Sequence, residues 1–238
     1  MNITASFRDP SLSASDFPEI LARISKIINA LTTRDDTLRY ENWMLKGDTQ
    51  QEASMYHVYD SGGSATPAAI AVLREEFRGK DDFTYVAMWD GNLETNDGAS
   101  ISCHVGDKHF PDTLSVRIDG DAWRTYTAIV DVVSEIVAVF SPLLVEVTLD
   151  AYSTKQVFDD KPGVGWMLYL PKVITAQQVP EAHALLPVPE KGKKQAGTII
   201  VSVTDGPFST DNPEHVETAN RIEIRLVDQD LLPRYVDL

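Results

Sequence analysis

The chain has 238 residues and carries 36 acidic against 21 basic side chains, which gives a formal net charge of -15. A surface this negative repels nucleic acid and attracts basic proteins, so direct nucleic-acid binding is not expected. Hydrophobic residues make up 43% of the sequence, enough for a sizeable core, which argues against extended disorder. Length alone allows one large domain or two small ones.

The single cysteine, Cys103, cannot form a disulfide within the chain, which is typical of proteins in a reducing compartment. The first residues lack the basic flank and apolar stretch of a signal peptide. Apolar runs also fall short of the roughly 20 residues that span a bilayer. We therefore expect a cytoplasmic protein that does not associate with a membrane.

The acidic residues are unevenly distributed. Nine of them lie between Asp81 and Asp121 against two basic residues, and eight lie from Asp205 onward against three. A general need for solubility would account for an evenly spread excess. Clustering on predicted loops favours surfaces that meet a basic partner instead.

The first half of the chain predicts helices and strands in alternation. A strand at 2–8 is followed by a helix after Asp16, and Thr66 with Pro67 begins a second helix that runs to about 78. Alternating apolar residues predict five further strands, at 40–46, 55–59, 83–90, 100–105 and 113–118. Because the loops between the last three are short, these strands should form an antiparallel meander.

In the second half, Asp121 is predicted to cap the longest helix, 122–140. The further predicted elements are strands at 143–149, 165–170 and 198–203, and helices at 175–184 and from Asn212 onward. A segment rich in proline, lysine and glycine, 187–194, is the best candidate for an internal hinge. With no fixed-period repeat and no long linker, we predict a single α+β domain over residues 1–238, with helices packed on a mostly antiparallel sheet.

Histidine and cysteine residues do not form a recognisable catalytic or metal-binding pattern. Cys103 and His104 are neighbours on a predicted strand, so their side chains point to opposite faces. The sequence contains no CxxC, HExxH or GxSxG motif. We therefore predict no catalytic residue, no metal and no cofactor. An enzyme or small-ligand-binding domain with a site assembled around His57, His104 and His109 is the alternative.

Two acidic loops are the strongest candidates for a partner-binding surface. Neither follows the EF-hand pattern with its closing glutamate, so calcium binding is not predicted. A tryptophan lies at a strand end beside each loop, and aromatic side chains are enriched at protein-binding surfaces, although a place in the core is the alternative for both tryptophans. The predicted partner-binding residues are Trp89, Asp90, Glu94, Asp97, Asp159, Asp160 and Trp166.

Several segments carry a family resemblance. They are Gly163–Pro171 (GVGWMLYLP), Gly197–Val203 (GTIIVSV), Asp211–Asn220 (DNPEHVETAN), Asp230–Pro233 (DLLP) and Trp43 in the early strand. In this order they resemble the immunity protein 52 family of bacterial polymorphic-toxin and type VI secretion systems. The resemblance implies a non-enzymatic antitoxin of α+β fold, with no catalytic residues, that binds a cognate toxin.

Toxins neutralised by such families are often nucleases of restriction-endonuclease fold, as the resemblance implies. A nuclease is basic where it holds phosphates, so an acidic inhibitor would be attracted to that groove and would reach it quickly. An adaptor or chaperone that loads a secreted effector would share the acidity and the lack of catalytic motifs, and stays an alternative. The sequence does not indicate the oligomeric state.

Overall fold

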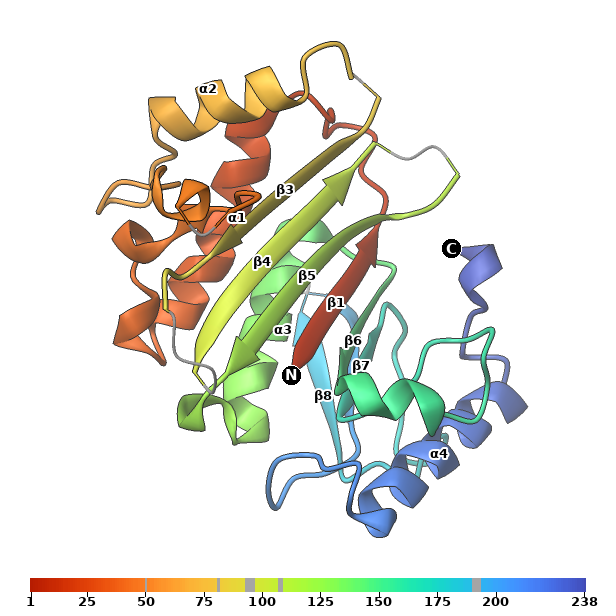
Figure 1. Ribbon diagram of the computed structural model, residues 1–238. Coiled ribbons are helices and arrows are strands. Elements are labelled where there is room, and N and C mark those ends of the chain that lie inside the picture. The colour runs from red at the N-terminus through yellow and green to blue at the C-terminus, as the bar shows by residue number, and fades with distance from the viewer. Residues whose placement is uncertain (50, 81, 93–96, 107–108, 190–193) are drawn as a thin grey trace. The chain divides into compact units, whose positions relative to one another are not determined.

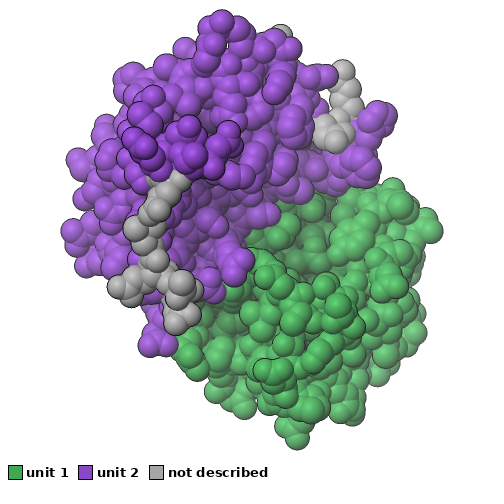
Figure 2. Space-filling view, in the orientation of Figure 1, with its two compact units in different colours: residues 1–6, 123–238 green, residues 7–122 purple. Residues whose placement is uncertain are grey.

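The computed structural model describes residues 1–238 except 50, 81, 93–96, 107–108 and 190–193 (Figure 1). The chain divides into two compact units (Figure 2), unit 1 with residues 1–6 and 123–238 and unit 2 with residues 7–122. The described residues form four α-helices and nine strands, and the strand pairings within each unit are antiparallel. The predicted α+β class is thereby confirmed.

Unit 2 contains four strands in the order β2-β3-β4-β5. They are β2 (Met44–Leu45), β3 (Thr84–Trp89), β4 (Gly98–Val105) and β5 (Asp112–Asp119). The last three form the predicted meander. Every second residue along them is buried, because successive side chains of a strand point to opposite faces. The apolar core of the unit therefore lies on one face of these strands.

Helices α1 (Phe17–Thr32) and α2 (Pro67–Glu76) lie on one side of strands β3 to β5 (Figure 1). Each begins where the sequence predicts. The Asp16 carboxylate accepts a hydrogen bond from the Glu19 amide at 3.2 Å, and the Thr66 hydroxyl accepts one from the Ala69 amide at 3.1 Å. These caps satisfy amides that have no partner within the helix.

Unit 1 contains five strands in the order β1-β6-β7-β9-β8 and two helices. The strands are β1 (Asn2–Phe7, of which Phe7 belongs to unit 2), β6 (Leu144–Thr148), β7 (Met167–Leu170), β8 (Ala184–Pro189) and β9 (Gln195–Val201). The helices are α3 (Tyr126–Phe140) and α4 (Pro213–Asp228). All four residues of β7 are buried, so this central strand is covered on both faces and is a continuous apolar run.

Of the strands predicted in unit 2, the one at 40–46 is shorter than predicted and the one at 55–59 is wrong. Residues 40–42 form a turn of 3-10 helix and only Met44–Leu45 pair as a strand, since Trp43 turns inward and its indole donates to the Leu38 carbonyl at 3.2 Å. Within 55–59 only isolated bridges form, between Met44 and His57 and between Tyr59 and Ala65. Alternation of apolar residues over such short runs does not distinguish a strand from irregular chain packed on the core.

The helix predicted at 175–184 is also wrong, because this segment forms turns and Ala184 already begins β8. Pro180 removes an amide donor and clashes with the preceding helical turn. Asp121 does not cap α3 either: it begins a short 3-10 turn, and the helix starts after Thr125. Of the predicted hinge 187–194, residues 187–189 belong to β8 and 190–193 lie outside the described residues.

Gly165 sits immediately before β7, where the chain adopts a positive φ of +50°. A Cβ atom here would lie 2.6 Å from the Thr148 methyl carbon and 2.8 Å from the Val147 carbonyl oxygen. The backbone of this residue therefore packs directly against β6, which only glycine allows.

We expect Gly165→Ala to lower the free energy of unfolding by about 2 kcal/mol, because it combines left-handed strain with a steric clash. Urea denaturation at pH 7 measures this loss. Gly206→Ala is the matched control: no atom lies within 4 Å of a Cβ there, and its effect should stay within about 0.5 kcal/mol. Equal stability of the two variants would contradict the account of Gly165.

Candidate functional site

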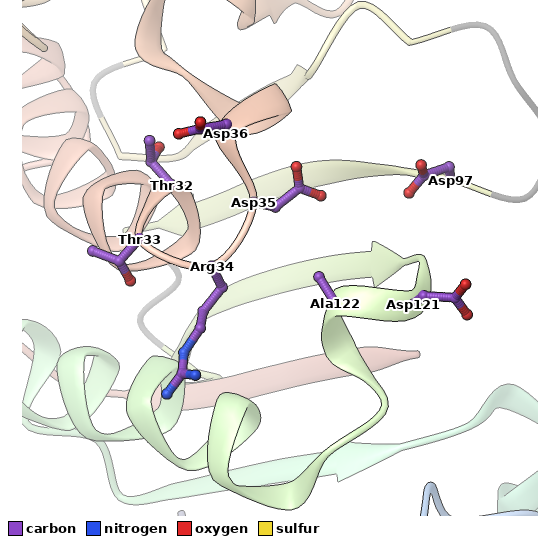
Figure 3. Close-up of a pocket in the computed structure, with 8 residues that line it drawn as sticks. All are labelled: Thr32, Thr33, Arg34, Asp35, Asp36, Asp97, Asp121 and Ala122. Carbon is purple, nitrogen blue, oxygen red and sulfur yellow. The ribbon is translucent and has the colours of Figure 1, made fainter.

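An acidic hollow of about 530 Å³ lies on unit 2 (Figure 3). Three segments supply its walls: the end of α1 with the turn after it, the residue before β4, and the chain after β5. The lining residues are Thr32, Thr33, Arg34, Asp35, Asp36, Asp97, Asp121 and Ala122. Four carboxylates and one guanidinium therefore share this depression, which we call the acidic hollow.

Local hydrogen bonds hold part of the acidic hollow in place. The Asp35 carboxylate accepts from the Thr37 amide at 2.9 Å and from the Thr37 hydroxyl at 2.6 Å. Asp36 pairs with Arg39 at 3.4 Å, largely exposed to solvent. Figure 3 shows Arg34 directed away from Asp97 and Asp121. The potential in the acidic hollow is therefore negative and favours a cationic side chain from another molecule.

The predicted residues of the first acidic loop have different environments. Asp97 is exposed and lines the acidic hollow, and Glu94 lies outside the described residues. Asp90 is only 8% exposed, and its carboxylate accepts from the Asn92 amide at 3.1 Å and the Ala99 amide at 2.9 Å. Burial raises the pKa of Asp90. Asp90 therefore holds Asn92 and Ala99 next to the end of β3. Half-buried Trp89 donates to the Ala53 carbonyl at 2.8 Å.

The predicted residues of the second loop belong to unit 1. Asp159 and Asp160 are exposed, and the Asp160 carbonyl accepts from the Tyr235 amide at 3.0 Å. Trp166 is 3% exposed and its indole donates to the Val203 carbonyl at 2.9 Å. Trp166 is thus a core residue, and together with Asp90 it is left out of the surface that we propose below.

The three histidines of the alternative site, His57, His104 and His109, make contacts that are common in folded proteins. His57 is exposed with Nδ1 2.7 Å from the Glu41 carbonyl oxygen, and burial lowers the pKa of half-buried His104. Exposed His109 also makes contacts. Burial raises the pKa of Cys103 to about 12, so this thiol is a poor nucleophile at neutral pH. Within the described residues, no group of three or more His, Cys, Asp or Glu is placed to hold a metal ion.

A buried carboxylate in unit 1 was not predicted from the sequence. Glu223 of α4 is 1% exposed and accepts three hydrogen bonds, from the Tyr152 hydroxyl at 2.5 Å, the Val164 amide at 2.9 Å and the Val157 amide at 2.8 Å. Such donors replace the water that a buried carboxylate loses. Glu223 therefore ties the chain between β6 and β7 to α4. The only signal in the sequence is an acid on the apolar stripe of that helix.

A second carboxylate, Glu146 of β6, lies near this network. It accepts from the Gly163 amide and from the Tyr235 hydroxyl, both at 3.1 Å. Burial raises the pKa of Glu146 to about 7, and the Glu223 carboxylate adds to the rise. Both carboxylates receive donors from the chain around Gly163–Pro171, one of the segments that carry the family resemblance. The network therefore supports the fold by joining β6, α4 and the chain before β7.

Comparison with known proteins identifies the family. The sequence model of immunity protein 52 matches residues 15–234, nearly the whole chain. The chain belongs to the immunity protein 52 family. None of the curated proteins matches it. Among solved structures, the Pseudomonas aeruginosa T6SS protein PA0821 is similar with a TM-score of 0.50 and 8% sequence identity, over 93% of this chain and 75% of that chain. At this identity the likeness concerns the fold alone.

In this immunity protein 52 family member, the helices within the described residues are too short or too polar to cross a membrane.

We expect Glu146→Gln to become more stable than the wild type as the pH rises. The native carboxyl binds its proton more tightly than the unfolded one, whose pKa is near 4.5, so ionisation opposes folding. The wild type should therefore lose up to about 3 kcal/mol relative to the variant between pH 4.5 and about 7. Denaturation curves over this range measure the difference.

Exposed Glu41→Gln is the control, because it also removes one carboxylate but at the surface of the protein. A constant difference between Glu146→Gln and the wild type from pH 4.5 to 8 would contradict the raised pKa.

Proposed function

We propose that this protein binds a cognate secreted toxin and neutralises it by forming a stable complex, without catalysis. Membership of the immunity protein 52 family is the observation that carries the proposal. The buried thiol of Cys103 is a poor nucleophile, which is consistent with a binding role. Protection would then require one inhibitor for each toxin molecule.

The toxin that we propose is a nuclease of restriction-endonuclease fold delivered by a type VI secretion system. We propose this route of delivery because the Pseudomonas aeruginosa protein of similar fold is a T6SS protein. The charge of -15 supports a basic partner, and a nuclease is basic where it binds phosphates. The lone cysteine is compatible with a reducing cytoplasm, where we place the encounter.

The proposed contact surface includes the exposed acids that the sequence predicts. Asp97 lies in the acidic hollow with Asp35, Asp36 and Asp121, and Asp159 with Asp160 forms a second acidic site on unit 1. Exposed charges act mainly on the rate of encounter, because they steer an oppositely charged partner before contact. We assign these acids to steering.

Co-expression with the neighbouring toxin gene tests the function. Cells that produce the toxin without this protein should die, and cells that produce both should survive. The two purified proteins should form a complex. Survival without a complex would favour an enzyme that removes the toxin or its product. A complex that gives no protection would favour the loading adaptor.

We expect the double variant Asp97→Lys/Asp121→Lys to associate with the toxin at least about tenfold more slowly at low salt, because charge reversal removes steering. The double variant Asp205→Lys/Asp211→Lys makes the same change in net charge at exposed acids of unit 1 and is the matched control. Stopped-flow or surface plasmon resonance measures both rate constants. Equal slowing by the two pairs would show that net charge alone, not the acidic hollow, directs the encounter.

A further inference from the structure

Strands β3, β4 and β5 turn one face towards the core and the other towards solvent. The second face holds three residues from each strand, in register across the sheet. Its rows are Tyr85–His104–Thr113, Ala87–Ser102–Ser115 and Trp89–Ser100–Arg117. We call these nine residues the open face. All of them are half-buried or exposed, while helices α1 and α2 lie on the other side of the strands (Figure 1).

One end of the open face is aromatic. The rings of Tyr85 and His104 lie 4.3 Å apart, and the ring of Phe83, 41% exposed, lies 5.8 Å from that of His104. The ammonium of Lys46 lies 5.5 Å from the centre of the Tyr85 ring, so this ring already receives a cation. Burial lowers the pKa of His104 and so favours its uncharged form. This aromatic end offers ring surface that a partner can bury.

The middle row of the open face is small. Ala87, Ser102 and Ser115 lie side by side on neighbouring strands, so a partner can approach the sheet closely there. Hydroxyl groups in that row can both donate and accept hydrogen bonds. Trp89 stands at the far end with its indole fixed by the Ala53 carbonyl. A row of small residues between aromatic side chains is suited to contact with a protein surface, whereas a small molecule needs a concave site.

The charge around the open face indicates the chemistry of the partner. The chain from Asp81 to Asp121, which includes β3, β4 and β5, holds nine acidic residues against two basic ones. Asp82 and Asp97 are exposed at the ends of these strands. A basic protein surface would be attracted to this rim, and its arginine or lysine side chains could stack on the aromatic rings.

We propose that the open face is the docking surface for a basic face of the cognate toxin, with Tyr85 and His104 at the energetic centre of the contact. The inference rests on the proposed function and deepens it. Acidic side chains then set the rate of encounter, whereas the open face sets the rate of dissociation. Buried aromatic contacts, and not the exposed acids, would hold the complex together.

Binding of the purified toxin from the neighbouring gene to the full chain tests this proposal. Tyr85→Ala removes one ring of the aromatic end, and Ser102→Arg places a long charged side chain on the small middle row. Each should raise Kd at least about tenfold through faster dissociation, with an unchanged Tm. Ser61→Arg is the matched control, since its turn lies on the helix side: the Gly63 carbonyl accepts from Ser25 of α1 at 2.8 Å.

Toxin binding within about twofold of wild type in both variants would overturn the proposal. It would also be overturned if light scattering showed a dimer that Ser102→Arg dissociates while toxin binding persists, because the open face would then join two copies of this chain. Failure of the wild type to bind the toxin at all would refute the proposed function itself, and this inference with it.

Discussion

A chain with 36 acidic residues can fold only if its carboxylates stay in water or receive hydrogen bonds in exchange. Asp90 and Glu223 are only 8% and 1% exposed, and each accepts from backbone amides. Each carboxylate joins separate backbone segments: Asp90 links the end of β3 to the Asn92 and Ala99 amides, and Glu223 of α4 holds Val157 and Val164 of the segment before β7. The negative surface and the two buried anchors are therefore consequences of the same constraint.

The same constraint separates encounter from affinity. Exposed carboxylates such as Asp97, Asp159 and Asp160 are well solvated, so they contribute long-range attraction but little binding energy once contact is made. High affinity requires apolar surface that is removed from water on binding. On unit 2 this area is available where the strands present Tyr85, His104 and Trp89 beside a row of small residues, within reach of the acidic rim.

Much of this arrangement could be predicted from the sequence, because it depends on local periodicity. Alternation identified β3, β4 and β5, and caps at Asp16, Thr66 and Asn212 located three helices. Residues whose environment is made by distant segments could not be predicted. Trp166 and Asp90 lie next to exposed loops in the chain, yet other segments bury them. The network of Glu146 and Glu223 also includes Tyr235 and the loop with Gly163 and Val164. These four parts come from separate stretches of the chain, and no local pattern indicates that they meet.

We propose that protection comes from stoichiometric binding rather than from catalysis. Residual activity of the purified toxin, titrated with this protein at a toxin concentration well above Kd, distinguishes the two most directly. With stoichiometric binding, activity should fall linearly, reach its end point at a fixed molar ratio and not fall further with incubation time. Complete inactivation by a small fraction of an equivalent, progressing with time, would show turnover and rule out stoichiometric binding.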